Sequence, residues 1–269
     1  MTIVEDLKKC LNPEIKYGTT FTERADHATE IALEAVANGA DAVIAVGGDG
    51  SVNEVGKALI NTKVALGIIP CGSGNGFARH LKIPLQVKKA IEHLNEFKTR
   101  IIDTGIVNGE PFLATAGLGF DAHIGEKFAN FGKRGFLSYL QVTASEFINF
   151  KSNNYDLIID GKKINTNAFL INFANSGQYG NNAWIAPTAS VSDGKLEVCI
   201  LEEFPAHNAP DIIFKLFSKQ ISQSSYYNSS QACEIKVLNA RNYHLDGEPR
   251  ENKGDLMIKV VPNSLKVIY

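Results

Sequence analysis

The sequence predicts an N-terminal α/β domain with a doubly wound sheet, followed by a largely antiparallel β domain. Helix-like and strand-like patterns alternate along the N-terminal part, and Gly-rich loops follow two short apolar strands. Further along, hairpin dipeptides separate strand-like runs. We place the boundary so that residues 1–101 form the first domain and residues 102–269 form the second.

Composition and charge limit the classes of function. The 269 residues are 44% hydrophobic and 21% charged, as in a soluble globular protein. A net charge of −2 argues against nucleic acid as a partner, because binding to phosphate backbones needs a basic surface. No apolar run is long enough to span a membrane, and the N-terminus lacks the apolar core of a signal peptide. Four scattered cysteines predict a reducing, cytoplasmic location.

Apolar spacing predicts the elements of the first domain. Asp26–Ala37 carries apolar side chains on one helical face, and Asn38-Gly39 ends that helix because glycine accepts the left-handed conformation. Ala42–Val46 is short and apolar throughout, as expected for a strand buried on both faces of a parallel sheet. The elements expected next are a helix over Val52–Leu59, a strand over Val64–Ile69 and a helix over Pro84–Asn95.

Turn dipeptides and apolar runs predict the second domain. Asn108-Gly109, Asp160-Gly161 and Asp193-Gly194 have the composition of two-residue hairpin turns. Helices are expected over Asp121–Ala129 and Leu137–Phe150. The strand-like runs are Tyr155–Ile159, Ala168–Ala174, Leu196–Leu201, Ile235–Leu238 and Leu256–Val261.

Two Gly-rich loops suggest a phosphate-binding edge in the first domain. GGDGS begins at Gly47, directly after the first strand, and PCGSGNG begins at Pro70, directly after the second. Glycines let backbone N–H groups approach an anion, and the helix that follows adds its positive end. Asp49 would repel phosphate unless it helps to hold Mg²⁺ or orients a hydroxyl or a water. The simpler alternative is that Asp49 caps the helix in a tight turn.

The motifs follow the order found in one known family. Gly47–Val55, GGDGSVNEV, resembles the GGDG[T/S]xNE signature of the diacylglycerol kinase and sphingosine kinase superfamily of lipid kinases. The similarity continues through Pro70–Arg79, Ile102–Gly105, Ala116–Asp121, Ala186-Pro187, Ser192–Val198 and Leu245–Glu248. This resemblance implies a nucleotide-binding α/β domain, a β-sandwich domain for the lipid, and an active site between them.

The resemblance also implies roles for individual residues, with ATP and Mg²⁺ as cofactors. Asp49 would lie at the ATP phosphates, Asp246 would accept the proton of the lipid hydroxyl, and Glu248 would lie near the metal or nucleotide. Without the upstream motifs, Asp246-Gly247 would be one more hairpin turn, and the nearby His244 would be an ordinary strand histidine. The other expected nucleotide contacts are Gly47, Gly48, Gly50, Ser51, Asn53, Glu54, Gly72, Ser73, Gly74 and Asn75.

Two features depart from the family pattern. Relatives begin with a further strand and an Asn-Pro-x-x-Gly loop, whereas Met1–Leu11 reads like the remainder of the helix that follows them. We therefore expect that strand to be missing, which would leave a sheet edge unpaired. The resemblance implies that Asp103 supports a structural Mg²⁺, but bacterial diacylglycerol kinases carry Asp where this chain has Gly76, so Asp103 would lack an acidic partner.

Two functions other than a lipid kinase are also compatible with the sequence: a kinase with a different substrate and a protein that is not an enzyme. An NAD kinase also carries GGDG, but its Asn-Glu pair lies in a later motif, whereas Asn53-Glu54 follows the first loop directly. A non-catalytic nucleotide- or lipid-binding protein is the alternative that the missing loop favours. A homodimer is compatible with the sequence, which leaves the oligomeric state open.

The expected partners are the lipid substrate and, transiently, the inner face of a membrane. Two stretches interleave aromatic and basic residues in a way that suits docking on lipid headgroups: Phe128–Leu140, with Lys133 and Arg134, and Ile212–Lys219. The simpler interpretation of both is a helix that packs its apolar side into the β domain.

Overall fold

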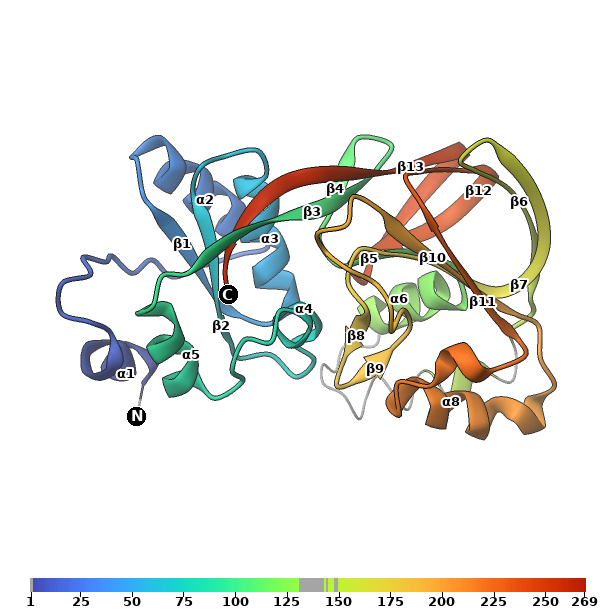
Figure 1. Ribbon diagram of the computed structural model, residues 1–269, viewed down its shortest axis with the longest axis horizontal. Helices are drawn as coiled ribbons and strands as arrows, with labels where there is room; N and C mark the ends of the chain where they lie inside the picture. Colours follow the sequence, from blue (N-terminus) through green and yellow to red (C-terminus); the bar gives the residue numbers. More distant parts are fainter. Residues whose placement is uncertain (1, 131–142, 144, 148–149) are drawn as a thin grey trace. The chain divides into compact units, whose positions relative to one another are not determined.

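The computed structural model describes residues 2–130, 143, 145–147 and 150–269 (Figure 1). The chain forms two units: unit 1 comprises Met1–Ile102 together with Asn263–Tyr269, and unit 2 comprises Asp103–Pro262. Two long strands, β3 (Thr99–Val107) and β13 (Glu248–Ile268), contribute residues to both units. The C-terminal end of the chain is therefore part of the N-terminal fold.

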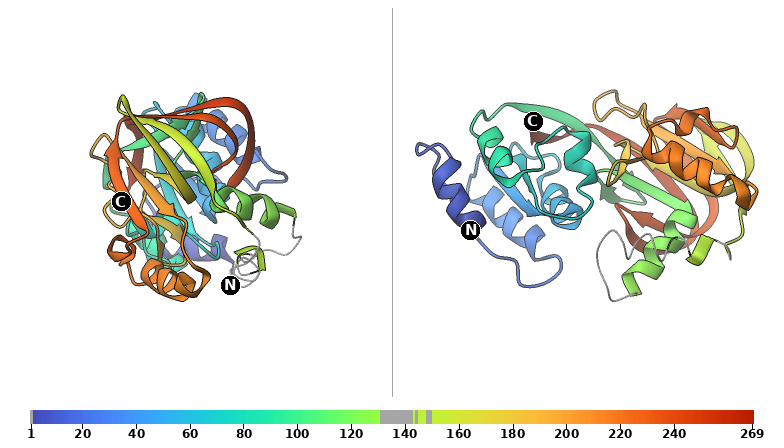
Figure 2. Two further views of the ribbon diagram at one scale, coloured as in Figure 1. Left: turned by 90° about the vertical axis from the view of Figure 1, so that its right-hand side faces the viewer. Right: turned by 90° about the horizontal axis from the view of Figure 1, so that it is seen from below.

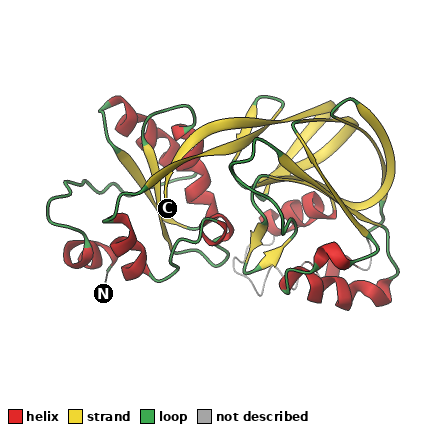
Figure 3. Ribbon diagram, viewed as in Figure 1, coloured by secondary structure: helices red, strands yellow, loops and turns green. Residues whose placement is uncertain are grey.

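Unit 1 has the α/β organisation that the alternating patterns predict (Figure 3). Strands β1 and β2 pair in parallel along their whole length, and Val267 near the end of β13 pairs in parallel with Leu66 of β2. Besides the parts of β3 and β13, its elements are α1 (Ile3–Cys10), α2 (His27–Ala37), β1 (Ala42–Gly47), α3 (Asp49–Leu59), β2 (Ala65–Pro70), α4 (Gly76–His80) and α5 (Val87–Leu94).

Helices cover the sheet of unit 1. Ala65 and Ile69 of β2 belong to one apolar cluster with Ile91 and Leu94 of α5, and α1 packs against the same cluster. Strand alternation turns Leu66 to the opposite face, where it is also fully buried. Helix α3 contacts both β1 and β2, and α2 packs on α3. The sheet thus holds the C-terminal ends of β1 and β2, and the loops after them, in a fixed frame.

One expectation about this sheet is wrong. Strand β1 is not buried on both faces: Ala45 is 2% exposed, but Val46 is 42% exposed. The reason is that β1 forms the edge of the sheet in the part of the chain that the structure describes, where it pairs with β2. Strand β2, which has neighbours on both sides, is buried along its whole length.

Unit 2 is rich in antiparallel strands, as the turn dipeptides predict (Figure 2). Strand β7 pairs with β5, β6 and β10, and β12 pairs with β5, β6 and β13, so the strands surround one apolar core. The further elements are β4 (Glu110–Phe112), β5 (Thr115–Gly119), α6 (Phe120–Asn130), β6 (Asn153–Ile159), β7 (Lys162–Ala174), β8 (Gln178–Gly180), β9 (Ala183–Trp184), β10 (Leu196–Glu202), α8 (Ala209–Phe217), β11 (Tyr227–Ala232) and β12 (Glu234–Leu245).

Two of the three turn predictions are confirmed. Asn108-Gly109 joins β3 to β4 and Asp160-Gly161 joins β6 to β7, with positive φ at both residues of each pair. Asp193-Gly194 is not a hairpin, since it precedes β10 without a paired strand directly before it, and of the two only Gly194 has a positive φ. The helix expected over Leu137–Phe150 lies largely outside the described residues, as do Lys133 and Arg134.

Two observations concern the chain as a whole. All four cysteines carry free thiols. Across the residues described, no helix combines the length and the apolar character needed to cross a membrane.

Candidate functional site

Backbone contact between the two Gly-rich loops defines the candidate site of unit 1. The loops follow the paired residues Gly47 and Pro70, and the N–H of Cys71 donates to the carbonyl of Gly47 at 2.8 Å. A Cβ at Gly72 would lie 2.4 Å from Cα of Gly48, and a Cβ at Gly48 would lie 3.1 Å from Cα of Gly72. Glycine is required at both positions because the two main chains touch. The loops therefore form one backbone surface at the carboxyl ends of the strands, where α/β sheets bind ligands.

Asn75 fixes the shape of the second loop. Its φ is 51°, its Oδ1 accepts the N–H of Gly72 at 3.0 Å, and its Nδ2 donates to the carbonyl of Gly72 at 2.7 Å. Nε of Arg79 donates to the carbonyl of Gly74 at 3.0 Å. Asn75 is buried, whereas Ser73 is exposed at the tip. The side chain of Asn75 thus stabilises the conformation of the second loop, because both of its polar atoms bond to the loop backbone.

Asp49 connects the two loops. It is the first residue of α3, and its Oδ1 accepts the N–H of Phe77 at the start of α4 at 3.3 Å. The simple N-cap alternative is therefore wrong for its own helix: the carboxylate contacts the start of the other one. Burial raises the pKa of the Asp49 carboxyl above its usual value, although the backbone N–H groups of Gly76, Phe77 and Asn75 act in the opposite direction. Gly50, next in the chain, is exposed.

The remaining predicted contacts on α3 have different surroundings. A Cβ at Gly47 would lie 2.5 Å from Oγ of Ser51, so this hydroxyl packs against the loop. Asn53 is 3% exposed, and neither polar atom of its amide has a hydrogen-bond partner among the described residues. Glu54 points elsewhere: its Oε2 accepts the N–H of Ala28 at 3.1 Å, which caps the start of α2. The structure thus places Glu54 against a neighbouring helix.

Asp246 lies in the turn between β12 and β13 of unit 2. Asp246 and Gly247 have φ values of 51° and 85°, as in a type I′ hairpin turn. The N–H of Asp246 donates to the carbonyl of Thr115 at 2.7 Å. Its carboxylate accepts three backbone N–H groups, from Leu113 at 2.9 Å, Ala114 at 2.7 Å and Thr115 at 3.0 Å. The carboxylate is therefore held in one orientation against the start of β5.

A second Asp-Gly turn in unit 2 has nearly the same construction. Asp160 and Gly161 have φ values of 44° and 82°, and the N–H of Asp160 donates to the carbonyl of Glu234. The Asp160 carboxylate accepts the N–H groups of Cys233 and Glu234. Turn geometry alone therefore does not distinguish Asp246 from Asp160, and the chain contains its own structural control.

His244 and Asp121 form a buried pair beside the Asp246 turn. Nε2 of His244 lies 2.8 Å from Oδ2 of Asp121, which also accepts the hydroxyl of Tyr179 at 2.8 Å and Nδ2 of Asn172 at 3.0 Å. Burial disfavours the charged form of both side chains, but their hydrogen-bonding and charged neighbours have the larger effect. The pKa of Asp121 therefore lies below its usual value, and the pKa of His244 lies above its usual value. Nδ1 of His244 accepts the N–H of Gly247 at 3.2 Å. Asp121 lies in a matched motif, but sequence reasoning gave it no role.

Glu248 pairs with an arginine that the sequence analysis missed. Nη2 of Arg250 lies 3.1 Å from Oε2 of Glu248 and 2.7 Å from Oε1 of Glu110, and Nε of Arg250 also donates to Glu110. The hydrogen bonds that Arg250 donates to Glu110 raise the pKa of its guanidinium; burial opposes this shift and Glu248 adds to it. The i, i+2 spacing of Glu248 and Arg250 on a strand was the available signal, since it places both on one face.

Asp103 has an internal structural partner. It is 2% exposed, and its Oδ2 accepts the N–H of Gly194 at 2.7 Å. Its backbone bonds to the carbonyl of Val191 and to the side chain of Asn175. No cluster of three or more His, Cys, Asp or Glu that could hold a metal occurs among the residues described. These surroundings do not fit a metal cage built from protein side chains, and a metal at Asp103 stays a prediction.

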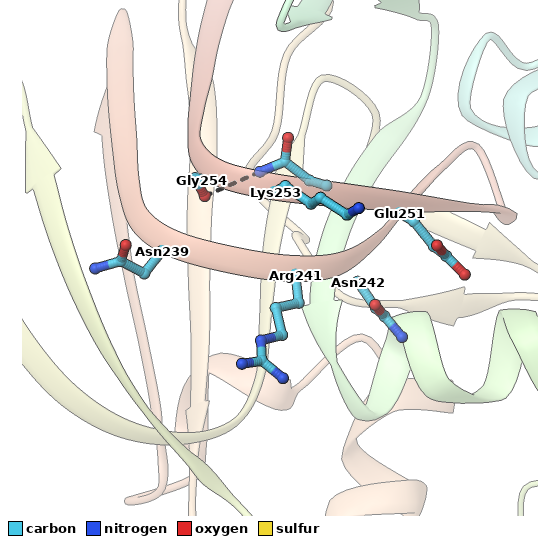
Figure 4. A pocket seen from close by; sticks show the side chains of 7 residues that line it. Asn239, Arg241, Asn242, Glu251, Lys253 and Gly254 are labelled. Atoms are coloured by element: carbon cyan, nitrogen blue, oxygen red, sulfur yellow. Dashed lines mark hydrogen bonds between the residues drawn. The ribbon is translucent and has the colours of Figure 1, made fainter.

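A polar hollow of about 760 Å³ lies on the β12–β13 hairpin, and none of the predicted site residues lines it (Figure 4). Its walls carry charges of both signs, Arg241 and Lys253 against Glu251. Nδ2 of Asn252 donates to the carbonyl of Gly254, two residues further along β13, at 2.9 Å. It is an open bend of the hairpin with no convergent chemistry.

Comparison with known families identifies the class of protein. Residues 2–107 match the diacylglycerol kinase catalytic domain, and residues 114–269 match the YegS C-terminal NAD kinase beta sandwich-like domain. These two matches, in this order, define a lipid kinase of two domains. The chain belongs to this family of diacylglycerol-kinase-type lipid kinases, as the motifs predict.

Individual relatives support this assignment. An uncharacterized protein of Synechocystis sp. is 28% identical over 97% of this chain, which spans 65% of that protein's length. A Yersinia enterocolitica protein named "Probable lipid kinase YegS-like" is 29% identical over 87% of this chain and 80% of its own, and a Bacillus subtilis diacylglycerol kinase is 29% identical over 91% and 84%. The crystal structure of a diacylglycerol kinase from Bacillus anthracis has a TM-score of 0.76 at 19% identity, over 99% of this chain and 91% of that one. The similarity to this crystal structure, at 19% identity, shows a shared fold only.

Proposed function

We propose that the chain is an ATP- and Mg²⁺-dependent lipid kinase that phosphorylates a hydroxyl of a diacylglycerol-like or sphingoid lipid. Membership of the lipid kinase family supports the class of reaction. The observation that carries the proposal is the contact between the loops at Gly48 and Gly72, where backbone without side chains forms the surface. A surface of this kind suits the phosphates of a nucleotide.

Unit 1 would bind the nucleotide. The N-terminal end of α3 would add the positive end of an 11-residue helix, worth about 0.3–1 kcal/mol toward an anion. Asp49 would take the Mg²⁺ that accompanies ATP, since Mg²⁺ in such sites needs only one or two carboxylates besides the phosphates. The metal supplies neutralisation of the charge on the phosphates. Asn53 has a buried amide whose two polar atoms make no hydrogen bond within the described residues, so it would form hydrogen bonds with the nucleotide.

Unit 2 would supply the base. The Asp246 carboxylate would accept the proton of the lipid hydroxyl as the hydroxyl oxygen attacks the γ-phosphorus, whose bond to the bridging oxygen breaks and releases ADP. Three backbone hydrogen bonds fix the carboxylate, so it needs no reorientation during the reaction. Phosphoryl transfer demands mainly positioning and charge neutralisation, and a rigid carboxylate contributes to the first.

An assay with labelled ATP tests the function. The full chain, with ATP labelled in its γ-phosphate and Mg²⁺, is offered mixed vesicles with diacylglycerol, vesicles with sphingosine, or NAD. We expect label in a lipid and none without Mg²⁺. Label in NADP would instead establish an NAD kinase, and binding of ATP without any product would establish a non-catalytic protein.

Helix α8 is the part of the structure that best suits contact with a bilayer. It buries Ile212, which is 3% exposed, but leaves Ile213 51% and Phe214 63% exposed. Just after the helix, Nζ of Lys219 lies 4.0 Å from the ring centroid of Trp184. Exposed aliphatic and aromatic side chains beside Trp and Lys are typical of surfaces that enter the headgroup region. We therefore propose that α8 touches the membrane that holds the substrate.

Removal of these apolar side chains tests the contact. The double variant Ile213→Ser/Phe214→Ser should sediment less with anionic phosphatidylglycerol vesicles, because the exposed apolar area of α8 is lost. Phe21→Ser is the matched control, since Phe21 is 74% exposed but lies in unit 1. Equal sedimentation of wild type and double variant would rule out α8 as the contact.

A further inference from the structure

Asp121 of α6 forms a buried pair with His244 of the β12–β13 hairpin. The side chains are 10% and 3% exposed, and one oxygen of Asp121 faces His244, Tyr179 and Asn172. A carboxylate and an imidazole removed from water lose solvation that their mutual contact only partly restores, so such a pair is a weak source of stability. Its presence beside the Asp246 turn calls for a reason other than stability.

The surrounding chain leaves room for the pair. Gly117 of β5 is paired with His244 of β12, and a Cβ at Gly117 would lie 2.5 Å from Nε2 of His244 and 2.6 Å from Oδ2 of Asp121. Any other residue at this position would push the pair apart. Gly117, the first of the two glycines in the Ala116–Asp121 motif, is therefore explained by the side chains of His244 and Asp121, which pack against it.

His244 links this pair to the turn that carries Asp246. Its Nδ1 accepts the N–H of Gly247, so in this state the ring proton is on Nε2 and faces Asp121. Asp246 itself is tied to β5 through its own N–H and its carboxylate. Both residues of the turn are thus anchored, the first by β5 and the second by His244. Nδ1 is taken by Gly247, and Nε2 is buried 2.8 Å from the Asp121 carboxylate, so neither ring nitrogen faces a substrate.

The second Asp-Gly turn shows that this link is not needed to make the turn. Asp160-Gly161 has the same conformation and a carboxylate that also accepts backbone N–H groups. The residue two positions before Asp160 is Ile158, at the place that His244 takes before Asp246. A hairpin of this type therefore forms in the same unit with an aliphatic residue there. The His–Asp pair is an addition specific to the turn with Asp246.

We propose that Asp121 and His244 form a positioning pair: Asp121 orients the His244 ring, and His244 holds Gly247 so that the Asp246 carboxylate keeps its direction. The proposal rests on the proposed role of Asp246 and names two positioning residues for it, neither of which touches the substrate. Hydrogen bonds of this kind usually narrow the range of orientations available to a reacting group.

Kinetics of four variants test the pair. His244→Ala should lower kcat about tenfold, the effect of one lost hydrogen bond, and leave the KM values for ATP and lipid unchanged. His244→Asn should recover most of this loss, because its Oδ1 can take the place of Nδ1 and accept the N–H of Gly247. Asp121→Asn should lower kcat in the wild-type background but add little to His244→Ala, since it acts through His244. Arg241→Ala, at an exposed position of the same strand, is the control and should change nothing.

A second readout does not depend on activity. Hydrogen exchange of the Gly247 amide, followed by NMR, should be slow in wild type and His244→Asn and fast in His244→Ala. Equal exchange in all three, or independent effects of Asp121→Asn and His244→Ala on kcat, would overturn the pairing. Slow exchange in an inactive wild-type chain would instead confirm the link and contradict the proposed kinase function.

Discussion

At the scale of the residue, Asp49 shows a conflict between stability and function. Burial raises the pKa of its carboxyl above the usual value, despite hydrogen bonds from the start of α4. The folded chain therefore binds this proton more tightly than the unfolded chain. The ionised carboxylate destabilises the fold at pH values above its folded pKa, and this cost disappears as the pH falls below the ordinary pKa of a carboxyl. Such a cost is expected where a charge is kept for a ligand.

Replacing this carboxylate should reveal the cost. Asp49→Asn removes the charge while its amide oxygen can still accept the N–H of Phe77, so its Tm should exceed that of wild type at mildly alkaline pH. The difference should shrink as the pH falls through the raised pKa of the folded carboxyl, and it should vanish below the ordinary carboxyl pKa of about 4, where the unfolded chain also binds the proton. Asp41→Asn, at an exposed carboxylate just before β1, should show no such trend. A lower Tm for Asp49→Asn at alkaline pH would refute this account of the charge.

At the scale of the element, the two loops depend on each other. The main chains meet at Gly48 and Gly72, and Asn75 braces the second loop from within. The proposed phosphate-binding surface is therefore a property of the pair of βα connections. Either loop alone would be an ordinary tight turn.

Gly72→Ala should separate the loops. Its Cβ would lie 2.4 Å from Cα of Gly48 and 2.9 Å from Oδ1 of Asn75, and backbone must move to relieve this. We expect a loss of about 1–3 kcal/mol in the free energy of unfolding, from overpacking, together with weaker ATP binding measured by calorimetry. Gly18→Ala, which has no atom within 4 Å of its Cβ, should change neither quantity. Unchanged ATP affinity in Gly72→Ala would show that the loop contact does not form the nucleotide site.

Local patterns predicted most elements but not their partners. The apolar faces of α2, β2 and β7 are visible in the sequence because helix and strand periods place them there. The exposure of β1 depends on which strands pair with it, and Gly194 serves Asp103, 91 positions away in the chain. Likewise, the sequence cannot show that the carboxylate of Glu54 caps α2, because that contact arises only when the helices pack.

At the scale of the whole molecule, the two units have different proposed roles, since unit 1 would bind the nucleotide and unit 2 would supply the base. The structure and the sequence support the assignment of Asp246 as the base in different ways. The structure shows two Asp-Gly turns of the same kind, at Asp160 and Asp246. The family motif around Leu245–Glu248 and the pair of His244 and Asp121 separate the candidate base from its structural counterpart.

The most direct measurement compares Asp246→Asn with Asp160→Asn in the lipid kinase assay and in ATP binding. Each variant removes a carboxylate that accepts backbone hydrogen bonds in an Asp-Gly turn, so Asp160→Asn is the structural control, although Asp246 accepts three N–H groups and Asp160 two. If Asp246 is the general base, its variant should lose about a hundredfold to ten-thousandfold in kcat with unchanged ATP affinity, while Asp160→Asn keeps its turnover. An equal kcat in the two variants would contradict the central claim.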